Sequence, residues 1–259
     1  MSKGVRLGIS LVALLALGSG LLVATTWAPS NIVCPVCQTK NSFSEIMSYG
    51  SYIYGWPSKF QFVFWPMTDG NSLYSCKHCH LTLFMWDFKE VPPGKIEDLR
   101  AVLTGIHTDS DPAKYTDFPM SQRLEIAEKL YANLDKDDDF WCLFYRVKGY
   151  HLATEKKTIE AGIARGKALD LARKMLNDPA HAGEKKELFI ISAAMHHFLQ
   201  DDNSAKGDLE AAQTAPYENK KLTAEQNKNV NDNLNGLVKE YLERLEKKTV
   251  PADDGTDKE

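Results

Sequence analysis

The spacing of hydrophobic positions changes once along this chain of 259 residues. In the stretch 60–65, phenylalanines occupy every second position, and this period of two predicts a β-strand. Turn residues follow at 69–71, and an extended apolar run resumes at 73–74. We therefore expect short antiparallel strands and hairpins within residues 29–91.

From about residue 92 the apolar positions recur every three or four residues, a spacing that predicts helices. Pro92, Pro93 and Gly94 punctuate the change. The polar tail, residues 249–259, cannot bury a core, and we expect it to be disordered. The expected helices cover residues 96–103, 124–134, 140–152, 159–176, 188–199, 205–212 and 223–247.

The first 28 residues differ from the rest, because Lys3 and Arg6 precede an uncharged apolar run over residues 7–28. This run is long enough to span a bilayer, which takes about 17–25 residues. We interpret it as a membrane-anchor helix; a signal peptide cleaved after Thr26-Trp27-Ala28 is the alternative. In both cases the two basic residues stay in the cytoplasm. The expected location is membrane-anchored with the soluble part periplasmic or extracellular, or secreted if the segment is cleaved.

Composition is that of an ordinary globular protein, with 43% hydrophobic and 25% charged residues. The net charge is −4 and no basic stripe is present, so nucleic acid is not an expected partner. The chain has no Gly-rich phosphate loop, nucleophile elbow or nucleotide fingerprint. We therefore expect neither an enzyme nor a small-molecule substrate.

Four of the five cysteines form two C-x-x-C units, Cys34-Pro35-Val36-Cys37 and Cys76-Lys77-His78-Cys79. A tetrahedral Zn²⁺ takes two thiolates from each such knuckle at about 2.3 Å, and two knuckles complete its shell. A closed shell of this kind is structural, since it leaves no position for a substrate. The sequence predicts a structural zinc site with Cys34, Cys37, Cys76 and Cys79 as ligands.

Disulfides are the alternative use of these four cysteines, paired within the knuckles or across them, because an oxidising exterior favours them. Energy favours zinc: one disulfide contributes about 2–4 kcal/mol, whereas structural zinc contributes about 10–16 kcal/mol. A segment of about 60 residues is too small to be stable without strong support of the kind that zinc gives. A redox site is disfavoured, since no βαβ pattern surrounds either unit.

Other candidate residues have simpler interpretations. Cys142 lies in an apolar stretch and is expected to be a core residue. His78 and His80 are expected on an exposed knuckle. The acidic run 135–139 lacks the glycine of a calcium loop and is expected to mark a helix boundary.

Tyr49, Tyr52, Tyr54 and Trp56 give the spacer between the knuckles more aromatic surface than a small ribbon can bury. One interpretation is that the helical domain packs on them. The other is an exposed patch for a partner or for the bilayer surface.

Together, a C-P-x-C knuckle, a long aromatic spacer, a second C-x-x-C and following helices resemble the bacterial family catalogued as domain of unknown function 2225. The segment Phe140-Trp141-Cys142-Leu143-Phe144-Tyr145-Arg146 is similar to that family's aromatic helix. The resemblance implies that the four cysteines are zinc ligands and that the helices are similar to tetratricopeptide repeats. A repeat begun at Lys185 ends at Pro216; an irregular helical bundle fits the same residues.

The expected fold class is α+β, in four parts. These are an N-terminal membrane anchor or signal peptide (1–28), a small antiparallel zinc ribbon (29–91), an all-α helical-hairpin, tetratricopeptide-like domain (92–248) and a tail (249–259). The expected function is a membrane-anchored protein-interaction or scaffold module that binds a protein or peptide partner on a concave helical surface. The alternative is an extracytoplasmic thiol–disulfide or metal-handling protein.

Overall fold

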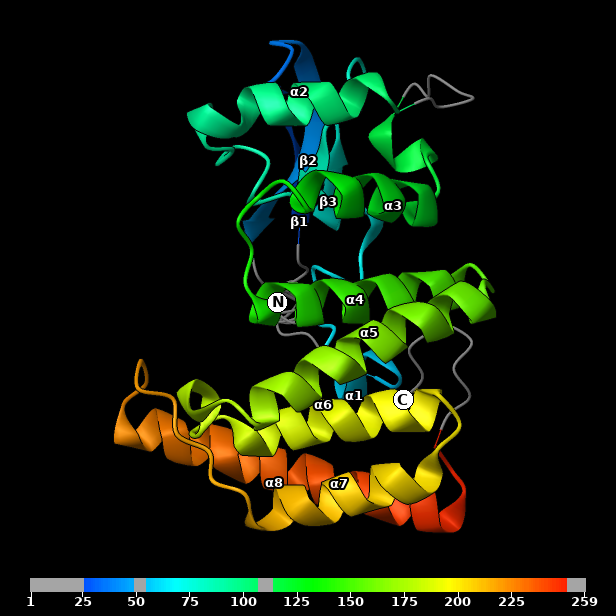
Figure 1. Cartoon of the computed structure of the whole chain (residues 1–259), viewed down its shortest axis with the longest axis vertical. Helices are drawn as coiled ribbons and strands as arrows, with labels where there is room; N and C mark the ends of the chain where they lie inside the picture. Colours follow the sequence, from blue (N-terminus) through cyan, green and yellow to red (C-terminus); the bar gives the residue numbers. More distant parts are fainter. Residues whose placement is uncertain (1–25, 49–54, 107–113, 251–259) are drawn as a thin grey trace, which may run out of the picture.

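The computed structural model describes residues 26–48, 55–106 and 114–250. The fold is mixed, with two small two-stranded antiparallel sheets and mostly helices (Figure 1). The strands are β1 (Thr26–Val33), β2 (Lys40–Ser48), β3 (Leu73–Ser75) and β4 (Thr82–Phe84). The helices are α1 (Ser58–Gln61), α2 (Ile96–Thr104), α3 (Met120–Tyr131), α4 (Asp138–Thr154), α5 (Thr158–Leu176), α6 (Lys185–Phe198), α7 (Asp202–Thr214) and α8 (Ala224–Lys247). Short 3-10 turns are η1 (Gly70–Ser72), η2 (Pro93–Lys95), η3 (Tyr115–Asp117) and η4 (Pro179–His181).

Each C-x-x-C unit is the turn of a β-hairpin. Strand β1 pairs with β2 up to the pair Val33–Lys40, and β3 pairs with β4 up to the pair Ser75–Thr82. The two hairpins are held together by Phe43 of β2 and Tyr74 of β3, whose rings stack with centroids 4.2 Å apart. Aromatic packing of this kind therefore fixes one cysteine pair relative to the other.

The predicted strand at 60–65 is wrong, because α1 and a turn occupy this stretch. Phe62 adopts a left-handed conformation with φ 54°, which ends the helix. Phe60 is fully buried, and its ring stacks on Tyr241 of α8. Packing against helices that are distant in the sequence therefore determines the local conformation here. The alternation of phenylalanines along residues 60–65 does not.

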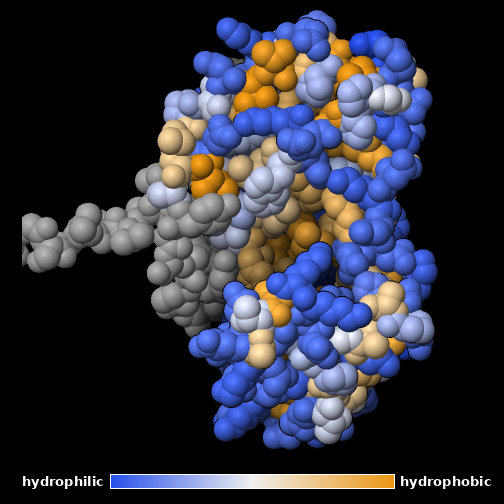
Figure 2. Space-filling model, turned by 90° about the vertical axis from the view of Figure 1, so that its left-hand side faces the viewer, coloured by the Kyte–Doolittle hydropathy of each residue, from blue (hydrophilic) through white to orange (hydrophobic). Residues whose placement is uncertain are grey.

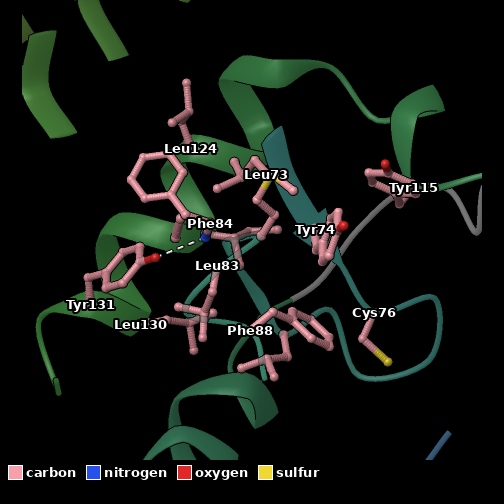
Figure 3. Close-up of a cluster of buried hydrophobic side chains, with 14 of the residues drawn as sticks. Leu73, Tyr74, Cys76, Leu83, Phe84, Phe88, Tyr115, Leu124, Leu130 and Tyr131 are labelled. Atoms are coloured by element: carbon pink, nitrogen blue, oxygen red, sulfur yellow. Dashed lines mark hydrogen bonds between the residues drawn. The ribbon is translucent and has the colours of Figure 1, made fainter. Parts of the chain in front are cut away.

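A first hydrophobic core joins the two hairpins to α2, α3 and α4. Leu73, Leu83 and Phe84 pack against Leu124 and Tyr131 of α3 (Figure 3). The Tyr131 hydroxyl accepts a hydrogen bond from the backbone N–H of Phe84 at 2.9 Å (dashed in Figure 3). The hairpins that carry the cysteines thus rest on helical side chains.

A second core lies at the other end of the molecule (Figure 1). Helices α4 and α5 form one hairpin, α6 and α7 form the next, and α8 packs on both α6 and α7. Trp56 and Phe60 enter this core beside Tyr241. For Trp56, the interpretation that helices pack on the aromatic spacer is confirmed; Tyr49, Tyr52 and Tyr54 lie outside the described residues.

Most predicted helices are confirmed within a few residues of their expected ends. The final helix begins after Thr223, whose hydroxyl accepts a hydrogen bond from the backbone N–H of Gln226. The acidic run 135–139 does mark a boundary, since α4 begins at Asp138. The predicted tail lies mostly outside the described residues, which end at 250.

The expected fold class and location need correction, since both assumed an N-terminal anchor helix. Among residues 26–250, apart from the two undescribed gaps, no helix has the length and apolar character needed to cross a bilayer. Thr26-Trp27-Ala28, expected at the end of the anchor, begins strand β1 instead. Residues 1–25, which hold the rest of the expected anchor or signal peptide, lie outside the described part.

Candidate metal centre

The structure brings the four predicted ligands together. The Sγ atoms of Cys34 and Cys79 are 3.6 Å apart, as are those of Cys37 and Cys76. All four sulfurs lie within 4.8 Å of one another. A disulfide needs an S–S distance of about 2.05 Å, so the four thiols are free.

These distances fit a common ion. Four sulfurs at about 2.3 Å from a tetrahedral centre are separated by about 3.8 Å along each edge. Two separations of 3.6 Å each join a cysteine of one knuckle to a cysteine of the other. The four cysteines could therefore hold one metal ion between the two hairpins.

The two knuckles have matching backbone conformations. The backbone N–H of Gln38 donates to the carbonyl of Cys34 at 3.0 Å, and that of His80 donates to Cys76 at 3.0 Å. Gln38 and His80 both have φ 60°, a left-handed conformation that non-glycine residues rarely adopt. Both turns thus point their two sulfurs the same way, and the site is built from two equivalent halves.

Asn41 joins the two halves, and the sequence analysis missed it. Its Nδ2 donates to the carbonyl of Thr39 at 2.9 Å and lies 3.5 Å from the Sγ of Cys76. Its Oδ1 accepts the backbone N–H of Lys77 at 2.9 Å. Asn41 is 3% exposed. No signal in the sequence marked Asn41, because its burial follows from the approach of the second hairpin; once buried, a polar residue needs hydrogen-bond partners.

The thiols cannot all ionise without a cation. Contact with Cys76, together with burial, raises the pKa of Cys34 to about 12, although contact with Cys79 acts in the opposite direction. Contact with Cys34 and Cys76, together with burial, raises the pKa of Cys79. Contacts with Cys34 and Cys79 lower the pKa of Cys76. Without a cation, the crowded sulfurs thus favour the ionisation of one thiol only. A bound cation would favour the ionisation of the others as well.

The centre has a buried side and an open side. Cys34 and Cys76 are fully buried, whereas Cys37 and Cys79 are partly exposed. The last two line a shallow cavity of about 700 Å³ together with His78 and Arg100. Arg100 of α2 donates to the carbonyl of Val36 at 2.9 Å, so this helix supports the first knuckle.

The neighbouring candidates do not join this cluster. His78 is exposed, and His80 packs edge-on against Phe118. Cys142 is 1% exposed, and its Sγ lies 3.6 Å from the carbonyl of Ala168. The interpretation of Cys142 as a core residue is confirmed.

Comparisons with protein-family models, with curated proteins and with solved structures found no match to this chain. The resemblance to the family of domain of unknown function 2225 therefore stays a prediction, and so does any tetratricopeptide relationship.

Proposed function

We propose that the four cysteines hold a structural Zn²⁺ and that the chain is a protein-interaction or scaffold module. One observation carries the zinc proposal: four sulfurs from two hairpins lie within 4.8 Å of one another, and two pairs are 3.6 Å apart, close to the edge of a tetrahedral shell. Four thiolates also select a soft or borderline ion over Mg²⁺ or Ca²⁺. With four protein ligands the shell is closed, which suits a structural ion.

The role of this ion is to support the hairpins. Strands β3 and β4 have three residues each, and such short pairs are marginally stable alone. The ion would tie them to β1 and β2, and the joined hairpins would then present one face to α3. The zinc centre thus supports a surface and performs no reaction; the absence of catalysis stays a prediction.

Two exposed isoleucines support the interaction role. Ile159 and Ile163 are 76% and 60% exposed and lie one turn apart on α5, so they share a face. Ile163 borders a small cavity of about 160 Å³, with Tyr145 and Lys167 on its wall. An apolar pair with a charged rim is typical of a surface that binds protein.

Val33, Met47 and Trp86 are the other exposed large hydrophobic side chains of the described residues. The face in Figure 2 is mixed at its upper end and mainly hydrophilic at its lower end, with a hollow between them whose visible floor is hydrophobic. Stacked helical hairpins commonly bind proteins or peptides along such surfaces. A protein or peptide with apolar side chains is therefore the partner that the chemistry favours.

Metal content and thiol reactivity test the centre. We expect the cysteine centre of the purified full chain to hold one Zn²⁺, with its four cysteines unreactive until a chelator is added. One exchangeable disulfide with a measurable reduction potential would instead support the thiol–disulfide alternative. A purified chain that holds neither zinc nor a disulfide would contradict both proposed functions.

A binding experiment tests the module. Proteins captured by the full chain would be identified, purified and rebound to the wild type and to the double variant Ile159→Asp, Ile163→Asp. We expect the double variant to lose binding while it keeps its Zn²⁺. Gln213→Asp, on the exposed face of α7, is the matched control. Equal binding by all three proteins would contradict a role for this face.

A further inference from the structure

Three more side chains that can bind a metal meet far from the cysteines along the chain. One donor atom each of Asp139, His181 and Glu184 lies within 4.8 Å of the others. Asp139 is in the first turn of α4, His181 ends η4, and Glu184 is the residue before α6. The group therefore joins the hairpin of α4 and α5 to the hairpin of α6 and α7.

The two contacts of His181 differ in kind. Its Nδ1 lies 3.0 Å from Oε2 of Glu184, which is hydrogen-bond distance. Its Nε2 lies 3.9 Å from Oδ2 of Asp139, which is too long for a hydrogen bond. Two ligands at about 2.0–2.2 Å from one tetrahedral ion are separated by about 3.4 Å. An imidazole binds an ion through one ring nitrogen, so only one of these two contacts can be a pair of ligands, and the third donor atom lies within 4.8 Å of both.

Negative charge is in excess around the group. Glu187, one turn along α6 from Glu184, forms no hydrogen bond or ion pair with any residue that the structure describes. Burial raises the pKa of Glu187, and although Arg146 acts in the opposite direction, Glu184 and Asp139 raise it further. These carboxylates repel one another, and a cation would relieve that repulsion.

We propose that Asp139, His181 and Glu184 form a second metal site, for a divalent transition ion such as Zn²⁺. An imidazole nitrogen disfavours Mg²⁺ and Ca²⁺ as occupants, since those ions prefer oxygen ligands only. Three protein ligands leave one tetrahedral position, which a water would fill. The ion would fix the connection between the two helical hairpins and stabilise their stacking.

A competing explanation is a protonated His181 between two carboxylates. Burial lowers the pKa of His181, but the hydrogen bond to Glu184 and the charge of Asp139 outweigh it, and the net shift is upward. In that case the group is an ion pair, and it binds no metal. Metal counting separates the two explanations.

Cobalt serves as the probe, because a cysteine site and a nitrogen–oxygen site give different spectra. The full chain would be stripped of metal and titrated with Co²⁺, with the bound ion counted by equilibrium dialysis. We expect one equivalent with thiolate charge-transfer bands and a second equivalent without them. The variants His181→Ala and Asp139→Asn should lose the second equivalent and keep the first.

His197→Ala is the matched control, since His197 pairs with a single carboxylate among the described residues, with its Nδ1 2.6 Å from Asp202. It should keep both equivalents. The site is overturned if the wild type binds no ion outside the cysteines, or if His181→Ala and Asp139→Asn bind as many ions as His197→Ala. Because the readout is a difference between variants, it holds even if the cysteine site takes no ion. Helical circular dichroism of each variant checks that it is folded.

Discussion

The Nδ2 of Asn41 lies 3.5 Å from the Sγ of Cys76, so a side chain from the first hairpin contacts a sulfur in the second. The same side chain accepts the backbone N–H of Lys77. Both contacts hold the second knuckle in the position that its cysteines need. Partners of this kind orient metal ligands and affect affinity nearly as much as the ligands do.

Asn41→Leu is expected to weaken metal binding by about 10–100-fold, the usual effect of losing a residue that orients ligands. Leucine has a similar size but leaves the N–H of Lys77 without its partner. An unsatisfied buried group costs about 1–3 kcal/mol, so the free energy of unfolding should also fall. Competition with a chelator of known affinity measures the first effect.

The control for this variant is Ser42→Ala. Ser42 is the next residue of β2, but it is exposed, so its loss should leave metal affinity unchanged. If Asn41→Leu and Ser42→Ala bind metal equally well, the bridging role of Asn41 is contradicted.

The cysteine cluster could be predicted because its chemistry is local. Each C-x-x-C unit makes a tight turn by itself, and a metal needs both turns. The meeting of the four cysteines at one point therefore followed from donor counting, with no knowledge of the strands. Asn41 could not be found in this way, because its role depends on the register of β1 against β2 and on the approach of the second hairpin.

Helices were predictable for a similar reason, since apolar positions three or four residues apart mark the buried face directly. The stretch 60–65 was not, because Phe60 is held by Tyr241, which lies far away in the chain. Arg146 of α4 also donates to the backbone carbonyls of Gln61 and Phe62. Contacts of such long range leave no periodic signal in the sequence.

Cys76→Ser should abolish metal binding at the cysteine centre, because a serine hydroxyl does not replace a buried thiolate ligand. Cys76 is fully buried. Cys142→Ser changes an equally buried thiol outside the centre and should hold as much metal as the wild type. Elemental analysis of both purified variants gives the result. A metal-free Cys142→Ser, or a fully loaded Cys76→Ser, would show that the ligands are assigned wrongly.

Removing the metal should loosen one end of the molecule more than the other. Cys34 and Cys76 belong to the first core, with the hairpins and α2 to α4. The second core, with α6 to α8, contains none of the four cysteines. After chelation we expect faster amide hydrogen exchange in β1 to β4 and α2, and little change in α6 to α8. Equal acceleration in both cores would show that the metal supports the whole fold directly.

Acid should destabilise the protein through His151 of α4. Its Nε2 lies 2.7 Å from the carbonyl of Met67, so this nitrogen donates a proton to that oxygen. Burial lowers the pKa of His151 to about 4, and the hydrogen bond to Met67 opposes this only in part. The unfolded chain, with a pKa of about 6.5, then binds the proton more readily than the folded protein.

The stability that a neutral His151 contributes is therefore complete above about pH 6.5 and is lost as the pH falls toward 4. By pH 5.5 the loss should be about 1.4 kcal/mol. His151→Gln keeps a donor for Met67 but does not titrate, so its unfolding free energy should fall less over this range. Urea unfolding at pH 7.5 and 5.5 measures this loss of unfolding free energy for the wild type and for the variant. Acid effects on the cysteine centre are common to both proteins and cancel in the comparison. The unfolding free energy of the control His197→Gln should fall with pH as much as that of the wild type. If the unfolding free energy of His151→Gln falls just as much, the acid-sensitive group is another residue.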